Sequence, residues 1–192
     1  MLTCHESSAT VTPHYALRCH PASPCATVRA IEVSVIATAS GALALSYRLH
    51  GDPENIAIPD LVPPAAADGL WQHTCLEAFV AAADDAGYRE FNFSPAGLWA
   101  NYRFTGYRER DPDFLPPTAP RIVFQRYADG FRLDAVLDPE LLPASDNLHV
   151  GLTAVIEAHD GSKSYWALAH CAAQPDFHLR QSFSLTLQRT MP

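Results

Sequence analysis

The hydrophobic residues of this chain recur at every second position over many short stretches, which is the pattern of β-strands with one buried face. Residues 27–38 and 42–50 both show it, and Ser40-Gly41 between them suits a tight turn. Residues 73–82 are almost entirely apolar, as expected of a strand that is covered on both faces. The first half of the chain therefore predicts a hairpin followed by a buried strand.

The remaining apolar runs are equally short, and turn residues such as Asp129-Gly130 separate them. They predict further strands at 88–94, 98–104, 122–127, 131–137, 149–157, 164–170 and 183–187. Sixteen prolines leave no room for long helices, and Pro139 suits the first position of a helical turn within 138–147. About ten short strands with frequent turns predict an all-β fold, a β-sandwich with few short helical turns.

A chain of 192 residues is long enough for one domain with a substantial core. We expect residues 27–190 to form a single β-sandwich ligand-binding domain, preceded by a partly irregular N-terminal segment over residues 1–26. Residues 108–120 are charged and rich in proline, and they predict a long surface loop.

Composition narrows the class of partner. A net charge of −8 argues against nucleic acid or an anionic membrane as the main partner, and no stretch approaches the ~20 apolar residues of a membrane helix. The N-terminus has neither the basic start nor the apolar run of a secretory signal, and five scattered cysteines fit free thiols, so the sequence predicts a cytoplasmic protein. Cys4-His5 and Cys19-His20 match no standard zinc spacing, which favours a flexible segment over a metal site.

Three tryptophans, Trp71, Trp99 and Trp166, follow turn residues. An aromatic plane at the end of a strand can stack on the apolar C–H face of a sugar ring, although a single tryptophan more often fills a core or covers an edge. Trp71 and Trp99 also stand near polar groups such as His73 and Asn92, which favours a binding role for these two.

Glu77 lies within the apolar run Cys75 to Val80, where a carboxyl must be paired or protonated. It could orient a ligand hydroxyl, bind a metal, act as a general acid, or form a structural ion pair with Arg89 or Arg103. Glu157 is the other carboxylate within a predicted strand, and the two could serve a glycosidase, although their spacing does not support it. The chain has no nucleophile elbow and no glycine-rich phosphate loop, so it carries no strong catalytic signature.

Nine histidines raise the alternative of metal or haem binding. His170 and His178 could approach each other on a loop, with His73 as a further ligand. Methionine is found only at the two ends of the chain, so haem would need histidine, or histidine with cysteine, as its axial ligands. The sequence predicts no obligatory cofactor and leaves haem and calcium open as ligands.

Three blocks of sequence are similar to a known family. They are Gly69-Leu70-Trp71-Gln72-His73-Thr74-Cys75-Leu76-Glu77-Ala78-Phe79, Tyr88-Arg89-Glu90-Phe91-Asn92-Phe93-Ser94-Pro95 and Trp99-Ala100-Asn101-Tyr102. They resemble the bacterial DOMON-like proteins, which are similar to the family-9 carbohydrate-binding module. The resemblance implies a β-sandwich of Ig-like or jelly-roll type with a ligand pocket or groove on one sheet, which binds sugar or haem and is usually not an enzyme.

In the sugar-binding relatives two tryptophans hold a sugar between them, and polar side chains meet its hydroxyls. The resemblance thereby implies Trp71 and Trp99 as stacking residues, with Asn92 and Glu77 as polar partners. From the residues themselves we add three groups that could orient the ligand: His73, Arg103 and Arg108.

The leading hypothesis is thus a non-catalytic module for a small sugar-like ligand, of undetermined oligomeric state. The alternatives are a haem- or metal-binding domain, an enzyme that acts on a glycoside through Glu77 and Glu157, and self-association through an exposed edge strand.

Overall fold

The computed structural model describes residues 12–190 of the chain. Within that range the helical segments are three single 3-10 turns, η1 (Leu70–Gln72), η2 (Pro139–Leu141) and η3 (Arg180–Ser182). The strands are β1 (His14–Cys19), β2 (Val28–Ala37), β3 (Leu43–Gly51), β4 (Cys75–Ala82), β5 (Tyr88–Phe93), β6 (Trp99–Gly106), β7 (Glu109–Arg110), β8 (Arg121–Tyr127), β9 (Gly130–Leu137), β10 (Asn147–Glu157), β11 (Lys163–Ala167) and β12 (Leu185–Gln188).

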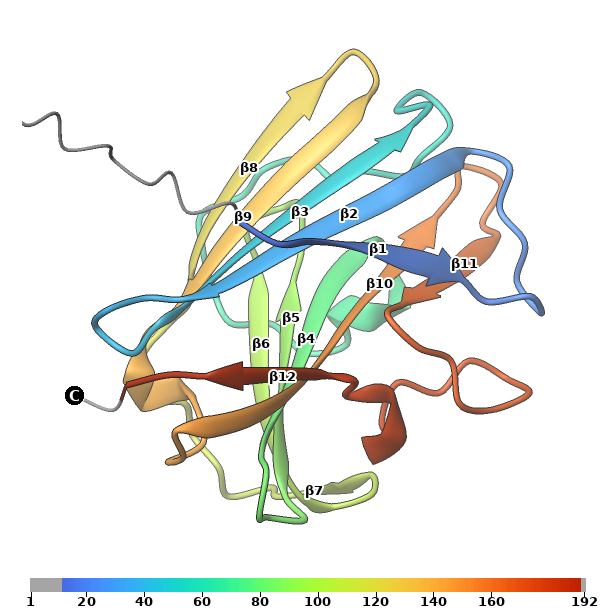
Figure 1. Ribbon diagram of the computed structural model, residues 1–192. Helices are drawn as coiled ribbons and strands as arrows, with labels where there is room; N and C mark the ends of the chain where they lie inside the picture. The colour runs from blue at the N-terminus through green and yellow to red at the C-terminus, as the bar shows by residue number, and fades with distance from the viewer. Residues whose placement is uncertain (1–11, 191–192) are drawn as a thin grey trace, which may run out of the picture.

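All neighbouring strands are antiparallel, in the order β7-β6-β5-β4-β10-β11-β1-β2-β3-β9-β8. The sheet folds over on itself, so that β2, β3, β9 and β8 form one layer and β6, β5, β4 and β10 the other (Figure 1). β1 joins the layers, because residues 14–17 pair with β2 and residues 18–19 pair with β11. The predicted β-sandwich is therefore confirmed.

The core between the layers follows the alternation of the sequence. In β3, residues Leu43, Leu45, Tyr47 and Leu49 are buried, and the positions between them are only partly covered. The second layer contributes alternate residues of β4, β5 and β10 to the same hydrophobic cluster. Burying these side chains on one face of each layer is the main source of stability of such a fold.

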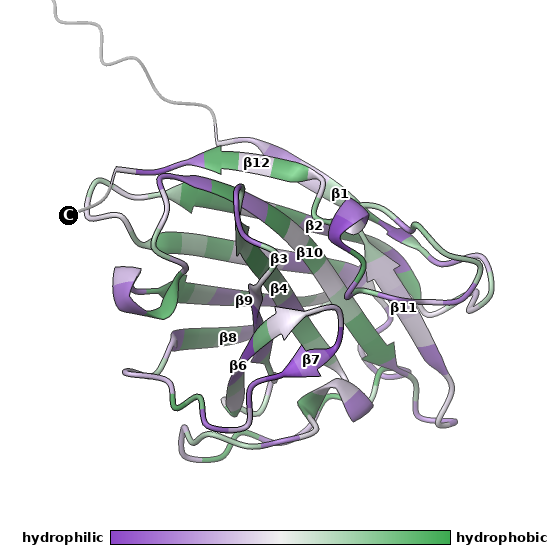
Figure 2. Ribbon diagram, turned by 90° about the horizontal axis from the view of Figure 1, so that it is seen from below, coloured by the Kyte–Doolittle hydropathy of each residue, from purple (hydrophilic) through white to green (hydrophobic). Residues whose placement is uncertain are grey.

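β4 and β10 are covered on their other face as well. Phe79 of β4 and Val155 of β10 join a second hydrophobic cluster, to which the segment between β11 and β12 contributes Phe177 and Phe183. Phe183 packs directly against the backbone of Gly151 in β10, where a Cβ atom would lie 3.0 Å from its ring. This C-terminal segment covers part of the outer face, and the hydrophilic β7 lies beside that face (Figure 2). The near-continuous apolar run of β4 is explained by this two-sided burial.

The hairpins and the turn at Pro139 agree with the pattern-based prediction, but β1 and β7 were missed. β1 lies inside the segment for which we expected little regular structure, and it lacks a run of large apolar residues. The prediction that Cys19-His20 belongs to a flexible segment is wrong. His20 is buried, and its Nε2 lies 3.2 Å from the carbonyl oxygen of Ala172. Cys4 and His5 lie outside the described residues. Within residues 12–190, no helix has the length and apolar character needed to cross a membrane.

The hairpin turn at Gly130 yields a prediction about stability. Gly130 has a φ of 142°, and a Cβ atom there would lie 2.0 Å from the carbonyl oxygen of Leu49 on β3. We expect Gly130→Ala to lower the free energy of unfolding by at least about 3 kcal/mol, because backbone must move to relieve the clash. Gly161→Ala is the control, since Gly161 has a φ of 83° but nothing within 4 Å of the added Cβ.

In the control only the backbone strain remains, about 1 kcal/mol. Urea denaturation of both variants measures the difference, and equal losses would contradict the close approach of β9 to β3.

Candidate functional site

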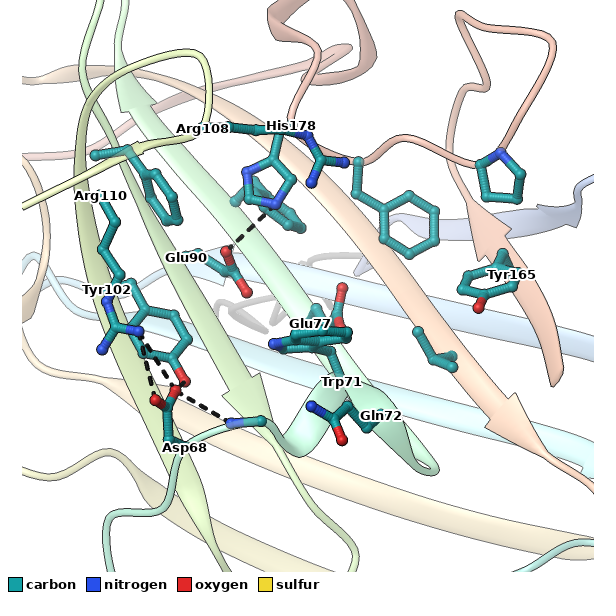
Figure 3. A pocket seen from close by; sticks show the side chains of 16 residues that line it. Asp68, Trp71, Gln72, Glu77, Glu90, Tyr102, Arg108, Arg110, Tyr165 and His178 are labelled. Carbon is teal, nitrogen blue, oxygen red and sulfur yellow. Dashed lines mark hydrogen bonds and ion pairs between the residues drawn. The ribbon is translucent and has the colours of Figure 1, made fainter. Parts of the chain in front are cut away.

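A cavity of about 640 Å³ opens on the outer face of the second layer, where the C-terminal segment leaves the sheet uncovered. Its floor is formed by β4 and β5, and its walls by η1, β6, β7, β10, β11 and the chain around His178. Figure 3 shows the side chains that line it. A volume of this size fits a small organic ligand.

Strand alternation places two carboxyl groups, Glu77 and Glu90, on the cavity floor. Glu77 is opposite Asn92 in the register of β4 and β5, and Glu90 is opposite Phe79. The two glutamates are thus diagonal neighbours on one face of adjacent strands, at a spacing of roughly 7–8 Å. Both are buried, with 2% of Glu77 and 4% of Glu90 exposed.

Glu77 has one satisfied and one unsatisfied carboxyl oxygen. Its Oε2 accepts a hydrogen bond of 3.0 Å from Thr153 on β10, whereas Oε1 is buried without a hydrogen-bond partner. Burial, together with the negative charge of Glu90, raises the pKa of Glu77 well above its usual range. Both effects favour the protonated form of Glu77.

Glu90 is held by an amide and lies near an imidazole. Its Oε1 accepts a hydrogen bond of 2.7 Å from Asn92, and its Oε2 is 3.8 Å from Nε2 of His178. Burial raises the pKa of Glu90 to about 7. Burial and the nearby Arg108 lower the pKa of His178 to about 4, so this imidazole is neutral and does not offset the charge of Glu90.

The rim of the cavity is polar and self-neutralising. Tyr102 donates a hydrogen bond to Asp68, and the guanidinium of Arg110 lies 4.1 Å above the Tyr102 ring and 3.5 Å from the Asp68 carboxylate. Arg108 forms an ion pair with Asp176 at 3.1 Å. Each arginine of the rim therefore already has an acidic partner.

Trp71 stands at the mouth of the cavity on η1. The turn that carries it begins at Gly69, which has a φ of 72° that suits glycine. Trp71 is half exposed, with 50% of its residue surface accessible to solvent. An exposed indole beside a cavity with a polar rim is a surface made for contact with a ligand.

The structure brings together some of the residues that the sequence singled out. Trp71, Glu77 and Arg108 line the cavity; Asn92 does not line it, but lies buried on the same face of β5 as Glu90, to which it donates a hydrogen bond. His73 does not line it, because its Nδ1 lies 2.8 Å from Glu157.

Trp99 and Arg103 are on the other face of the sheet. Trp99 is opposite Phe93, and Arg103 is opposite Arg89, both of which face away from the cavity. Arg103 pairs with Asp111 and stacks on Phe114. The expected pair of tryptophans around one ligand is therefore not formed, and neither Arg89 nor Arg103 is an ion-pair partner of Glu77.

The alternative readings of Glu157 and the histidines find little support in the geometry. Glu157 is four residues beyond Thr153 on β10, about 13 Å along the strand from the position opposite Glu77. Its carboxylate pairs with His73 and Lys163. Among residues 12–190 no group of three or more His, Cys, Asp or Glu side chains could hold a metal ion.

The histidines suggested as haem ligands are engaged elsewhere. Nε2 of His170 lies 2.8 Å from the carbonyl oxygen of Arg18, and Nδ1 of His178 lies 2.8 Å from the hydroxyl of Tyr88. His178 lines the cavity and His170 does not.

The sequence analysis did not single out several polar residues of the cavity, namely Asp68, Gln72, Glu90, Tyr102 and Arg110, and it named His178 only as a candidate haem or metal ligand. Glu90 is two residues from Asn92 on the same strand, so the sequence already indicated that both side chains point to the same face. The positions of the others depend on loops and cross-strand register, which periodicity alone does not fix.

Comparison with known proteins identifies the fold. No protein-family model matches the chain, and no curated protein matches it in sequence. A candidate carbohydrate-binding protein from Bacteroides uniformis superposes with a TM-score of 0.65 at 13% identity, over 93% of this chain and 87% of that one. A family-9 carbohydrate-binding module from Caldicellulosiruptor kristjanssonii in complex with cellotriose superposes with a TM-score of 0.59 at 10% identity, over 94% and 84%.

A family-9 carbohydrate-binding module from the same organism in complex with glucose gives a TM-score of 0.55 at 10% identity, over 93% of this chain and 85% of that one. The chain shares the fold of family-9 carbohydrate-binding modules. At these identities the likeness concerns the fold alone, and the resemblance to DOMON-like proteins stays a prediction.

Glu90 predicts how the stability of this fold depends on pH. Its pKa of about 7 in the folded protein returns to about 4.5 on unfolding, so the folded state binds more protons between these values. The stabilisation present at low pH is lost as the pH rises through 7. His178 opposes this only below about 6.5, because its pKa is lowered.

Between about pH 4.5 and 7 we expect the melting temperature of the wild type to lose several °C relative to that of Glu90→Gln, because the folded wild type holds an extra proton on Glu90 there and a tenfold change in proton affinity is worth about 1.4 kcal/mol. Glu54→Gln, at an exposed loop position, is the control and should keep the wild-type slope. Parallel slopes for Glu90→Gln and the wild type would mean that the Glu90 carboxyl titrates as in water. Differential scanning fluorimetry across the pH range makes the comparison.

Proposed function

We propose that the protein is a non-catalytic binding module and that its cavity takes a small sugar, either free or at the end of an oligosaccharide. The observation that carries the proposal is the half-exposed Trp71 at the mouth of a cavity whose floor and rim are lined by carboxyl, amide and guanidinium groups. A pyranose has the same division, with apolar C–H faces and a polar circumference.

Stacking would supply the apolar part of the affinity. The indole of Trp71 offers a large flat surface at little cost in conformational entropy, and Tyr165 and Phe177 add aromatic surface deeper in the cavity. The sequence predicted two stacking tryptophans. We assign the stacking role to Trp71 alone, with Tyr165 and Phe177 as the rest of the apolar wall.

The floor and rim would meet the hydroxyl groups. The raised pKa of Glu77 favours its protonated form, which can donate through its O–H and accept through the oxygen that has no partner in the protein, as a sugar hydroxyl requires. Asp68 and Gln72 add acceptors and donors at the rim next to Trp71. The combination of donors and acceptors fits a polyhydroxylated ligand better than a purely apolar or purely anionic one.

The positions of the glutamates favour binding over hydrolysis. In a glycosidase the two carboxyl groups flank the scissile bond. Glu77 and Glu90 come from adjacent strands of one sheet and approach a ligand from the same side. The solved neighbours with this fold, one in complex with glucose and one with cellotriose, support glucose and cello-oligosaccharides as the first ligands to test.

Replacement of Trp71 tests the proposal. We expect Trp71→Ala to weaken the binding of glucose, cellobiose or cellotriose by at least about tenfold, because the stacking surface is lost. Trp99→Ala is the matched control: it removes the same side chain from the opposite face of the sheet and should leave the affinity within about twofold.

Isothermal titration calorimetry of the two variants and the wild type gives the dissociation constants, and thermal melts verify that both variants are folded. The proposal fails if none of the three sugars binds the wild type. It also fails if Trp71→Ala and Trp99→Ala have equal effects.

A further inference from the structure

The charges of the cavity do not balance. At the rim Asp68 pairs with Arg110, and Arg108 pairs with Asp176. Glu77 and Glu90 are left on the floor, and among residues 12–190 no lysine or arginine forms an ion pair with either of them. His178 lies 3.8 Å from Glu90 but burial keeps it neutral, and Arg108 and Arg110 lower the pKa of Glu90 without forming an ion pair with it.

One carboxyl oxygen of Glu77 on this floor has no hydrogen-bond partner in the protein. This oxygen, Oε1, is buried, although the residue lines the cavity and Oε2 is satisfied by Thr153. A buried polar atom without a partner is rare in folded proteins and calls for an explanation, such as a ligand that completes its hydrogen bonding. Figure 3 shows both glutamates in the cavity, with His178 joined to Glu90.

A metal ion does not fit this position. Calcium takes six to eight oxygen ligands, and the described residues hold no group of three or more side chains suited to a metal. The aromatic rings of Trp71, Phe79 and Tyr165 line the same cavity, and such rings attract organic cations through their faces. Two carboxyl groups among aromatic rings therefore suit an organic ammonium group.

We propose that the cavity selects sugars that carry a protonated amine, with the ammonium group held between Glu77 and Glu90. The inference rests on the proposed sugar-binding function and names its ligand class, the amino sugars. The positive charge of the bound ammonium group would lower the pKa values of the two carboxyl groups, so that the pair releases a proton to solvent when the ligand binds. No bond is made or broken in the ligand.

Three sugars of one skeleton test the selection. At about pH 6.5, where the amine is protonated, glucosamine should bind the wild-type protein at least about tenfold more tightly than glucose. N-acetylglucosamine carries an uncharged and larger acetamide at that carbon, and it should bind no more tightly than glucose. Cyclohexylamine carries the ammonium group without the hydroxyls and should bind more weakly than glucosamine.

The glutamates are tested through the ratio of the glucosamine affinity to the glucose affinity, because both residues also belong to the proposed sugar site. Glu90→Gln and Glu77→Gln should each bring this ratio close to one, whatever happens to glucose binding itself. Glu54→Gln removes an exposed acidic group elsewhere and should keep the wild-type ratio.

The outcomes separate the two proposals. If glucose binds and glucosamine binds no more tightly, the amine selection is overturned and sugar binding stands. If cyclohexylamine binds as tightly as glucosamine, the ligand is an amine and the assignment to amino sugars is overturned. If none of the sugars binds, both proposals fall. A preference that persists in both Gln variants would overturn the role of the two glutamates.

Discussion

The structure depends on the burial of β4 and β10 on both faces. Their inward side chains fill the space between the two layers, while Phe79 and Val155 on the outer face pack under the C-terminal segment. A strand covered on both sides exposes none of its polar groups to water, so any polar side chain on it must find a partner inside the protein or in a ligand. The site exists because the C-terminal segment covers only part of this face and leaves a cavity over the rest.

Two-sided burial also sets the electrostatics of the site. Glu77 and Glu90 lie on the covered face of adjacent strands, where burial raises the pKa of both and the charge of Glu90 raises the pKa of Glu77 further. The arginines of the rim lower the pKa of Glu90 but form their ion pairs with Asp68 and Asp176 instead of with the glutamates. The floor thus keeps two carboxyl groups with which no lysine or arginine of residues 12–190 forms an ion pair.

Most of the strands could be predicted from the sequence, but only part of the candidate site could. Period-two alternation located the long hairpins because one face of each strand is buried, whereas β1 lacks that pattern and is held by pairing with two different strands. Glu77 stood out as a carboxyl within an apolar run. Trp99 was misplaced because its face depends on the register with Phe93, which a single strand does not reveal.

Most positions in this chain obey the rule that local pattern and environment agree, and the clearest exception is Glu77. Proteins tolerate such exceptions at functional sites, where stability is lost to keep a reactive or adhesive group in place. A leucine or valine at that position would suit the apolar run and the covered face better than a carboxyl with an open oxygen. Because the surrounding residues of β4 are apolar and fully buried, the fold itself does not require a carboxyl there. A ligand that forms a hydrogen bond with the unpartnered oxygen of Glu77 would explain why this position carries a carboxyl group.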